Sequence, residues 1–178
     1  MPEPRPPAPR PGSPQHPVRV AGSGDLAHLG PLEGRADAVF EPIFGALGWG
    51  APQSGEARAS EPGFLLVADD PPVGFVHVLL LDGAAHLEQL AVEPVLGRRG
   101  IGTALVEAAC AEAGRRGHDA ISLCTYADVP WNAPFYRRVG FEEVGDLAPF
   151  QAALRETERR LGLDRHGRRV VMERRLRR

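Results

Sequence analysis

Residues His86 to Thr103, HLEQLAVEPVLGRRGIGT, join an apolar strand pattern to a glycine-rich turn. The following stretch, ALVEAACAEAGRR from Ala104 to Arg116, is rich in helix formers, and its apolar residues recur at helical spacing. Strand, turn and helix are therefore contiguous. The pattern predicts a strand that ends before Pro94 and a helix whose first turn lies beside Gly100 and Gly102.

This turn has the features of an anion site. The first N–H groups of a helix lack partners and carry partial positive charge, and glycines such as Gly100 and Gly102 let an anion approach them. Arg98 and Arg99 add guanidinium groups, whose geometry suits phosphate oxygens. The turn is thus interpreted as a phosphate cradle; a tight strand-to-helix turn with nothing bound is the alternative.

Two nucleotide-binding motifs do not fit. A Walker P-loop needs Lys after its last glycine, but Thr103 follows Gly102 and the sequence contains no Lys. A dinucleotide-binding turn needs a third glycine, where Leu105 stands, and an acidic residue closing the next strand, whereas Asp119 precedes that strand.

Length and composition predict one ordinary domain. The chain has 178 residues and a net charge of -2, which gives no reason to expect nucleic acid or membrane as a partner. It has no apolar run of membrane-spanning length and no apolar signal core, so we expect a cytoplasmic protein. Cys110 and Cys124 lack metal-like spacing and are expected to be small buried hydrophobes.

The first 17 residues contain eight prolines and almost no large apolar side chain. Such a segment cannot bury enough apolar area to offset its ordering entropy, so residues 1–17 are predicted to be a disordered tail before a single domain at 18–178. A proline-binding partner is an alternative role for the tail.

Periodicity and turn residues predict the remaining elements. Helices are expected from Ser23 or Asp25 to about Gly30, from Gly34 to an interruption at Pro42, at 103–116, after an N-cap at Asn132 as far as Gly140, and at 148–161; strands are expected at 18–21, 64–68, 73–81, 120–125, 141–145 and 168–176, with a loop at 53–63. Short connections imply an antiparallel meander, and the helical crossover implies a parallel pair. The fold class is therefore α/β, a mostly antiparallel mixed sheet with a parallel central strand pair flanked by helices.

The segment LEQLAVEPVLGRRGIGTALVEAA, followed by NAPFYRRVGF at Asn132 to Phe141, resembles the acyl-CoA-binding half of the GNAT superfamily of N-acyltransferases. The resemblance implies a GNAT-like fold and acetyl-CoA as co-substrate. In the family signature, Gln/Arg-x-x-Gly-x-Gly/Ala, backbone N–H groups hold the CoA pyrophosphate. Gly100 and Gly102 match it, while Gly97 stands where Gln or Arg is expected and leaves Arg98 or Arg99 as substitutes.

The resemblance also implies which residues contact the co-substrate. The expected CoA-binding residues are Leu90, Ala91 and Val92, through their backbone along the pantetheine arm, and Arg98, Arg99, Gly100, Ile101, Gly102 and Thr103 in the cradle. Asn132 is a further candidate, although helix capping is the favoured role for it because its spacing to Tyr136 is shorter than in many family members.

Acetyl transfer to an amine needs a base. An alkylamine of pKa roughly 10.4 is neutral in about one molecule per thousand at pH 7, so removing its proton costs about 4 to 5 kcal/mol. His86 and Glu88 lie two apart on one strand and therefore share a face. They resemble the two His positions that relay protons in arylamine-acetylating members. The hypothesis is that Glu88 binds and deprotonates the amine with assistance from His86; ordinary polar strand residues are the alternative.

Tyr136 resembles the family's general acid. A phenol of pKa near 10 gives its proton to a thiolate near 8.5 at a cost of about 2 kcal/mol, so this role is expected to be modest.

The acceptor site is expected along the first helices, which border it in the GNAT fold. Glu33, Asp37, Phe40 and Phe44 share one helical face, and an acidic and aromatic stripe suits an amine with an apolar body. The alternative places the two Phe residues in the core and the acids in solvent. Trp131 is expected in the wall of a channel or in the core, and helix 148–161 as a lid.

The sequence thus predicts an N-acetyltransferase that moves an acetyl group from acetyl-CoA to the primary amine of a small molecule by direct attack in a ternary complex. The alternatives are a non-catalytic acyl-CoA-binding regulatory module and a protein or peptide N-acetyltransferase. No metal is indicated, and the resemblance implies a possible homodimer. The arginines at 168–178 are expected to form a solvated strand face, with an anion or RNA contact as the alternative.

Overall fold

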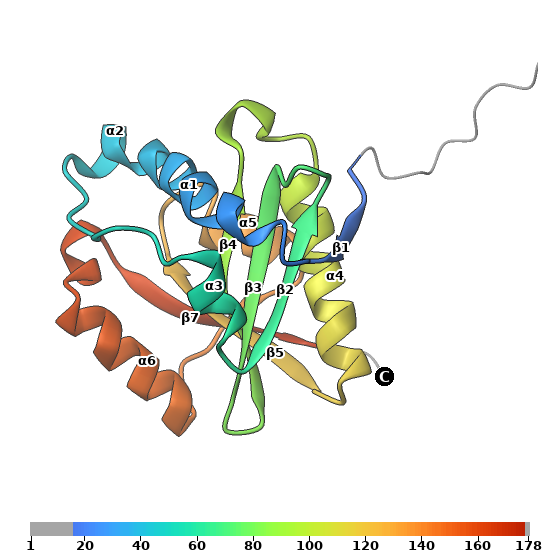
Figure 1. Cartoon of the computed structure of the whole chain (residues 1–178). Coiled ribbons are helices and arrows are strands. Elements are labelled where there is room, and N and C mark those ends of the chain that lie inside the picture. The colour runs from blue at the N-terminus through green and yellow to red at the C-terminus, as the bar shows by residue number, and fades with distance from the viewer. Residues whose placement is uncertain (1–15, 177–178) are drawn as a thin grey trace, which may run out of the picture.

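The computed structural model describes residues 16–176, so most of the predicted proline-rich tail lies outside the described residues. Seven strands form one sheet in the order β1-β2-β3-β4-β5-β7-β6 (Figure 1). The strands are β1 (Val18–Val20), β2 (Gly63–Ala68), β3 (Gly74–Leu81), β4 (Ala84–Val92), β5 (Ala120–Tyr126), β6 (Glu142–Glu143) and β7 (Arg169–Arg175). The helices are α1 (Leu26–Asp37), α2 (Glu41–Phe44), α3 (Gly55–Ala59), α4 (Ile101–Arg115), α5 (Ala133–Arg138) and α6 (Pro149–Arg160), with 3-10 turns at Ala38–Phe40, Pro94–Leu96 and Leu163–His166.

The sheet is mixed, as the sequence predicts. Strands β2 to β4 form an antiparallel meander with short turns, β1 pairs antiparallel with β2 although helices α1 to α3 lie between them in the chain, and β5 pairs antiparallel with β7. Only β4 and β5 are parallel, because the chain crosses over through α4 between them. The predicted mostly antiparallel mixed sheet with a parallel central strand pair is thereby confirmed.

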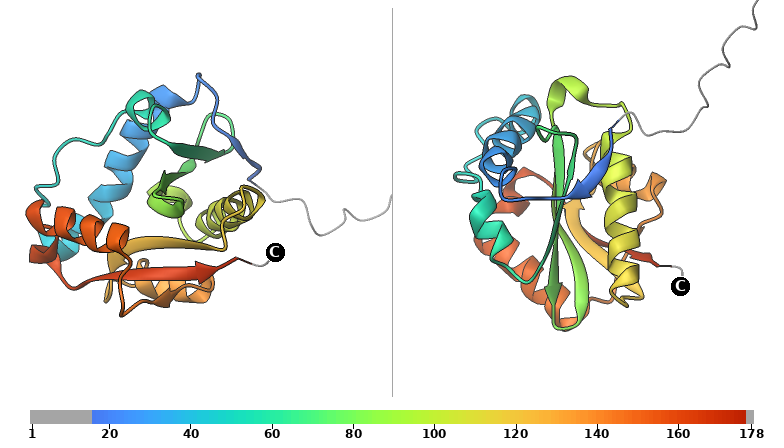
Figure 2. Two further views of the ribbon diagram at one scale, coloured as in Figure 1. Left: turned by 90° about the horizontal axis from the view of Figure 1, so that it is seen from below. Right: turned by 45° about the vertical axis from the view of Figure 1, so that its right-hand side comes forward.

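Both faces of the sheet are covered by helices (Figure 2). Along β2, Phe64 and Leu66 belong to the larger core beneath α4, whereas Leu65 and Val67 belong to a smaller core beneath α1. Successive strand side chains point to opposite faces, so an almost continuous apolar run is what a strand covered on both sides requires.

Two local predictions were wrong. Helix α1 continues through Gly30 and Pro31 instead of ending there, because Leu29 and Leu32 on either side are completely buried and their packing outweighs the missing proline N–H group. The segment 53–63 contains helix α3 in place of a plain loop. Its start is fixed by Ser54, whose hydroxyl accepts a hydrogen bond from the Ala57 N–H at 3.1 Å.

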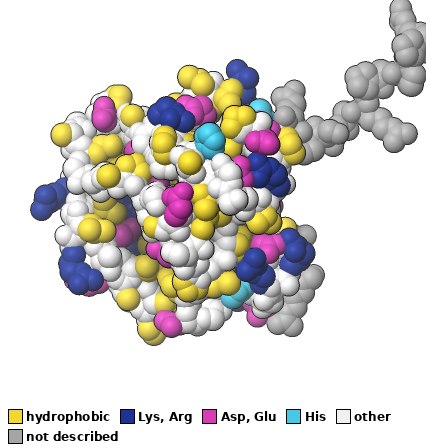
Figure 3. Space-filling model, viewed as in Figure 1, with side chains coloured by type: hydrophobic (Ala, Val, Ile, Leu, Met, Phe, Trp, Pro, Cys, Tyr) yellow, Lys and Arg dark blue, Asp and Glu magenta, His cyan; other side chains and the backbone are white. Residues whose placement is uncertain are grey.

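Acidic and basic side chains are interspersed on the face shown in Figure 3, which has no large area of one sign. Within residues 16–176, no helix is both long enough and apolar enough to cross a membrane.

The α4 core can be tested through Leu105, which is fully buried. Replacing it by Ala removes apolar contact and leaves a cavity, so Leu105→Ala is expected to lower the free energy of unfolding by about 2 to 5 kcal/mol. Urea denaturation measures this loss. The matched variant Leu161→Ala, at a side chain that is 69% exposed, is expected to change it by less than about 1 kcal/mol. Equal losses in the two variants would contradict this description of the core.

Candidate active site

The candidate site exists because two parallel strands separate. Pairing between β4 and β5 runs from Ala85 opposite Ile121 to Leu87 opposite Leu123 and then ends, although both strands continue. The gap opens a cleft of about 1390 Å³. Both strands line it, together with residues of α1, α3, α4, α5, α6 and β7.

A β-bulge directs Glu88 into this cleft. Gln89 pairs with His77 on β3 and Leu87 pairs with Val78, so Glu88 is the extra residue between them. Its side chain is 42% exposed and lines the cleft. The surrounding protein raises the pKa of Glu88 above its ordinary value because burial penalises the charged carboxylate, and the positive charge of Arg58 offsets part of the rise.

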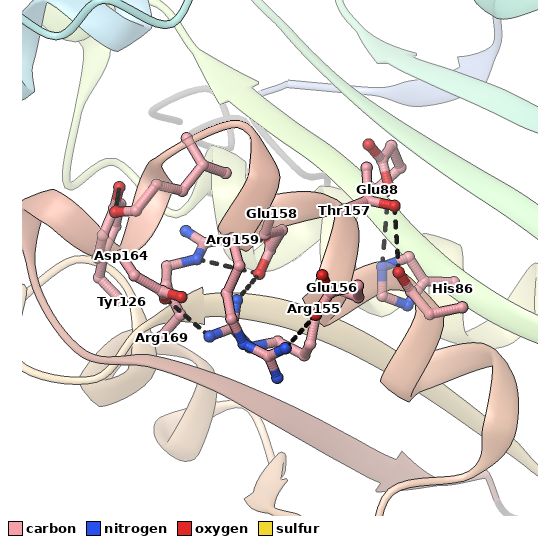
Figure 4. A network of polar contacts seen from close by, with 12 residues as sticks. His86, Glu88, Tyr126, Arg155, Glu156, Thr157, Glu158, Arg159, Asp164 and Arg169 are labelled. Atoms are coloured by element: carbon pink, nitrogen blue, oxygen red, sulfur yellow. Dashed lines mark hydrogen bonds and ion pairs between the residues drawn. The ribbon is translucent and has the colours of Figure 1, made fainter.

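His86 lies beside Glu88 but is buried (Figure 4). Its Nδ1 lies 3.0 Å from the Ser122 hydroxyl, and its Nε2 lies 3.8 Å from a Glu88 carboxylate oxygen. Burial lowers the pKa of His86 to about 4. The ring is therefore neutral at pH 7, and its hydrogen bond to Ser122 fixes its orientation next to the carboxylate.

The glycine turn forms a helix N-terminus that faces the cleft. Gly100 is the N-cap of the 15-residue helix α4 and has φ 83°, a conformation that favours glycine, while Arg98 has φ 64°. The N–H groups of the first turn after Gly100 have no partner within the helix. A Cβ placed at Gly102 would lie 3.6 to 3.9 Å from Phe135 and the side chains of β4, so the missing side chain leaves the helix end close to the strand.

The loop before α5 corrects the prediction for Asn132. It occupies the N-cap position, but its side chain makes no cap hydrogen bond, since its backbone angles of -106° and -114° are not those of a capping residue and Pro134 offers no N–H. Instead its Oδ1 is buried without a partner, and Asn132 lines the cleft. Tyr136 also lines the cleft but is 7% exposed, and burial raises its pKa.

Helix α1 supplies an acidic wall that rests on a buried ion pair. Arg58 of α3 donates to Glu33 at 2.5 Å, and its other terminal nitrogen lies 3.3 Å from Nδ1 of His77. Asp37 lines the cleft one turn after Glu33. Burial, and secondarily the charge of Glu33, raise the pKa of Asp37 to about 6.

The predicted aromatic stripe divides into two parts. Phe40 lines the cleft, with ring centroids 5.2 Å from Trp49 and 5.7 Å from Trp131. Phe44 does not line it and packs on Tyr126 at 4.9 Å. Both Phe side chains are half-buried, and Glu33 is buried and paired with Arg58 instead of solvated.

Residues of α6 and β7, from the C-terminal part of the chain, form one wall of the cleft, which the sequence does not predict in detail. Arg169 of β7 pairs with Glu158 of α6 and lies over the ring of Tyr126, 4.5 Å from its centroid; Figure 4 shows this network beside the catalytic candidates. Arg155 joins Glu158 to Asp164. The sequence predicts a solvated face for the arginines at 168–178, because no local pattern shows that a carboxylate of α6, such as Glu158, lies beside Arg169.

Both cysteines are free, and they differ in burial. Cys110 is buried as predicted, whereas Cys124 is only partly buried and lines the cleft. Cys124 lies on β5 where this strand has separated from β4, so its side chain is not covered completely. The prediction of full burial is therefore wrong for Cys124. Burial raises its pKa to about 12, so the thiol stays protonated.

Most predicted site residues meet in this cleft. Those lining it are Glu33, Asp37, Phe40, His86, Glu88, Leu90, Val92, Arg98, Gly100, Ile101, Gly102, Thr103, Trp131, Asn132 and Tyr136. Arg99 and Phe44 are not among the lining residues, and the Ala91 side chain is buried in the core beneath α1. Lining residues missed from the sequence include Trp49, Arg58, Arg138, Leu154, Glu158 and Arg169.

A mixed sheet whose parallel pair parts over a glycine-rich helix N-terminus defines an acyltransferase fold. Residues 37–141 match the model of the acetyltransferase (GNAT) family, and the chain therefore belongs to this family of N-acetyltransferase enzymes.

Several solved structures share the fold. The ribosomal-protein-S18-alanine N-acetyltransferase from Escherichia coli is 21% identical, with a TM-score of 0.62 and coverage of 91% of this chain and 94% of that one. The PaiA N-acetyltransferase from Thermoplasma acidophilum, solved with coenzyme A, is 16% identical with a TM-score of 0.64, covering 90% and 99%. N-acetylglutamate synthase from Neisseria gonorrhoeae, solved with coenzyme A and N-acetyl-glutamate, is 20% identical with a TM-score of 0.66, covering 94% of this chain and 36% of that one.

The neutral state of His86 has a measurable consequence. In the folded protein the pKa of His86 is about 4, below the ordinary value of 6.5 that it has in the unfolded chain. As the pH falls, the unfolded chain therefore binds this proton at a higher pH than the folded protein does. The free energy of unfolding consequently decreases as the pH falls from about 6.5 to about 4. The parent is expected to lose up to about 1.4 kcal/mol per pH unit more than His86→Gln over this window.

Urea denaturation at pH 7 and 5 tests the stability difference, and NMR titration of the ring tests the pKa itself. His77 is present in both proteins, so its contribution cancels in the comparison. A midpoint near 6.5 for His86, or identical pH dependence in parent and variant, would refute this description of the site.

Proposed function

We propose that this protein transfers an acetyl group from acetyl-CoA to the primary amine of a small molecule by direct attack in a ternary complex. The observation that carries the proposal is the position of Glu88. The bulge turns Glu88 into the cleft, which the helix N-terminus of α4 and the acidic residues of α1 also line. A base between an anion cradle and an acidic wall is the arrangement that this reaction needs.

The cradle half of the cleft, lined by Arg98, Gly100 to Thr103, Asn132 and Arg138, suits acetyl-CoA. The first-turn N–H groups of α4 are donors for the pyrophosphate. Arg98 and Arg138 form no ion pair or hydrogen bond with any residue in 16–176, so both guanidinium groups are available for phosphate oxygens. The unpartnered Oδ1 of Asn132 is an acceptor for an N–H of the co-substrate. Beyond Leu87, the edge of β4 that faces the cleft has backbone groups for the pantetheine arm.

Glu88 is proposed to bind the ammonium and remove its proton, directly or through water. Its raised pKa makes it a stronger base than an exposed Glu and reduces the difference between its pKa and that of the amine. The neutral amine then attacks the thioester carbonyl carbon, the C–S bond breaks, and the thiolate takes a proton. Burial lowers the pKa of His86 to about 4, so its ring is neutral at pH 7. His86 is therefore proposed to assist by orienting Glu88, whose carboxylate oxygen lies 3.8 Å from its Nε2.

Tyr136 is the proposed source of the proton for the thiolate. Because burial raises its pKa, its proton transfer is more costly than that of an ordinary phenol. Another proton source, such as water, can therefore replace it at moderate cost.

The proposed roles of Glu88 and Tyr136 predict different losses of activity when each residue is substituted. Glu88→Gln keeps the shape of the side chain but removes the base, so its kcat/KM is expected to fall by about 10² to 10⁴. Tyr136→Phe is expected to lower turnover more mildly, by about tenfold. In the parent, kcat/KM is expected to rise with pH through an apparent pKa above 4.5, the ordinary value for Glu, and this step should be absent in Glu88→Gln.

Thiol release from acetyl-CoA, measured over pH 5 to 9 with a panel of amines, checks these values, and calorimetry confirms that each variant still binds CoA. Unchanged turnover in Glu88→Gln would remove the base assignment. Tight CoA binding without turnover of any amine would instead favour the regulatory module.

The cradle can be tested with two adjacent arginines of α5. Arg138 lines the cleft, whereas Arg137 lies 3.6 Å from Glu143 and does not line it. Arg138→Ala is expected to raise the KM for acetyl-CoA by about fivefold, or ~1 kcal/mol, and to weaken its salt dependence. Arg137→Ala, which removes the same charge from the same helix, is expected to leave KM unchanged. Equal effects of both variants would show that general charge, and not contact, is responsible.

A further inference from the structure

The acceptor half of the cleft is lined by α1, α3, α6, β7 and the start of β4, and its charges are unbalanced. Its charged residues are the acids Glu33, Asp37, Glu88 and Glu158 and the bases Arg58 and Arg169. There are thus two more carboxyls than guanidiniums. This excess favours positively charged acceptors.

The two guanidinium groups are already neutralised. Arg58 is bound to Glu33 at 2.5 Å, and Arg169 is bound to Glu158 while it lies over Tyr126. A carboxylate on the acceptor would therefore find no free cation here and would lie close to two carboxyls. Amino acids are accordingly poor acceptors for this surface.

Two carboxyls remain without a cationic partner. Asp37 forms no hydrogen bond or ion pair with the described residues, 16–176, and Glu88 has only the neutral ring of His86 at 3.8 Å. The positive charge of Arg58 lowers the pKa of both carboxyls, which offsets part of the rise caused by burial. They stand on two different elements that line the cleft, Asp37 on α1 and Glu88 on β4.

The surface next to Asp37 suits an ammonium on an apolar chain. Phe40, one turn further along, lines the cleft in contact with Trp49 and Trp131. Ring faces beside a carboxylate attract a cation and also cover methylene groups. In the proposed reaction, Glu88 binds the nitrogen that is acetylated. An ammonium group bound by Asp37 must therefore be a different nitrogen.

We propose that the acceptor is a diamine, whose second ammonium is bound by Asp37 beside Phe40 while its first amine meets Glu88. Asp37 is then a specificity-determining residue and takes no part in proton transfer. The inference rests on the proposed acetyl transfer and narrows its acceptor to a dication without a carboxylate.

The test uses acceptors matched in length. For chains of four to eight carbons, the α,ω-diamine, the alkylamine and the ω-amino acid differ only at the far end, and kcat/KM is measured for each by thiol release. The parent is expected to prefer the diamine over the alkylamine by about tenfold or more, the value of one charge-assisted contact. The ω-amino acid is expected to be the poorest of the three.

The variant Asp37→Asn keeps the shape and removes the charge. It is expected to abolish the diamine preference while it retains turnover of the alkylamine, and to improve the ω-amino acid relative to the parent. The control Glu41→Gln removes the same charge from the exposed start of α2, outside the cleft, and is expected to keep the preference of the parent.

Alkylamine turnover in Asp37→Asn also shows that this variant is folded. Turnover of amines with no diamine preference, or with a preference that survives in Asp37→Asn, would overturn the role of Asp37 and leave the proposed acetyl transfer intact. Absence of turnover with every amine in the parent would overturn both.

Discussion

The short parallel pairing between β4 and β5 is the constraint on which the site depends. Three paired residues on each strand hold the sheet together, and the strands then part because β4 stays bound to β3 while β5 stays bound to β7. The N-terminus of α4 lies at the resulting gap, with Gly102 close to the side chains of Leu90 and Val92. A parted sheet leaves backbone groups of one strand edge in need of partners, and a bound ligand with amide groups can supply them. The fold thus creates a cleft that contains polar groups, while both apolar cores stay intact.

Charge within the cleft is divided between structural and available groups. Glu33 with Arg58, and Glu158 with Arg169, are pairs whose partners come from different elements, so each ties a helix to the sheet or to another helix. Removing one member of such a buried pair leaves an unpaired charge, which makes these residues structural even though they line the cleft. What remains for a ligand is a cationic end beside the cradle and an acidic end beside α1. In the proposed reaction, this division directs an anionic co-substrate and a cationic acceptor to different ends of the cleft, with Glu88 as the proposed base between their reacting atoms.

Local patterns predicted the elements that local chemistry determines. The strand, glycine turn and helix around Gly100 follow from one contiguous stretch, and the parallel pair follows from a helical crossover. The continuity of α1 through Pro31 could not be predicted in this way, because burial of Leu29 and Leu32 decides it. The same holds for the site. His86 and Glu88 were found from their spacing, but the bulge that directs Glu88 depends on the register with β3, and Trp49, Glu158 and Arg169 reach the cleft only through tertiary packing. Asn132 shows the reverse error, in which a favourable residue type for a helix cap was overridden by its backbone conformation.

The neutrality of His86 is compatible with the proposed role of Glu88 as a base beside it. A protonated imidazole 3.8 Å from Glu88 would lower the pKa of the carboxylate and repel an incoming ammonium. Burial prevents this, because it holds the pKa of His86 near 4 while it raises that of Glu88. Both shifts have the same physical origin, burial, which disfavours the charged form of each group. The shift in His86 keeps its ring neutral at pH 7, and the shift in Glu88 makes its carboxylate a stronger base. In the proposed reaction, the negative charge of Glu88 is compensated when the ammonium binds and is neutralised when its proton is transferred. The geometry of the sheet therefore determines the location of the proposed base and, through burial, also the direction in which its pKa is shifted.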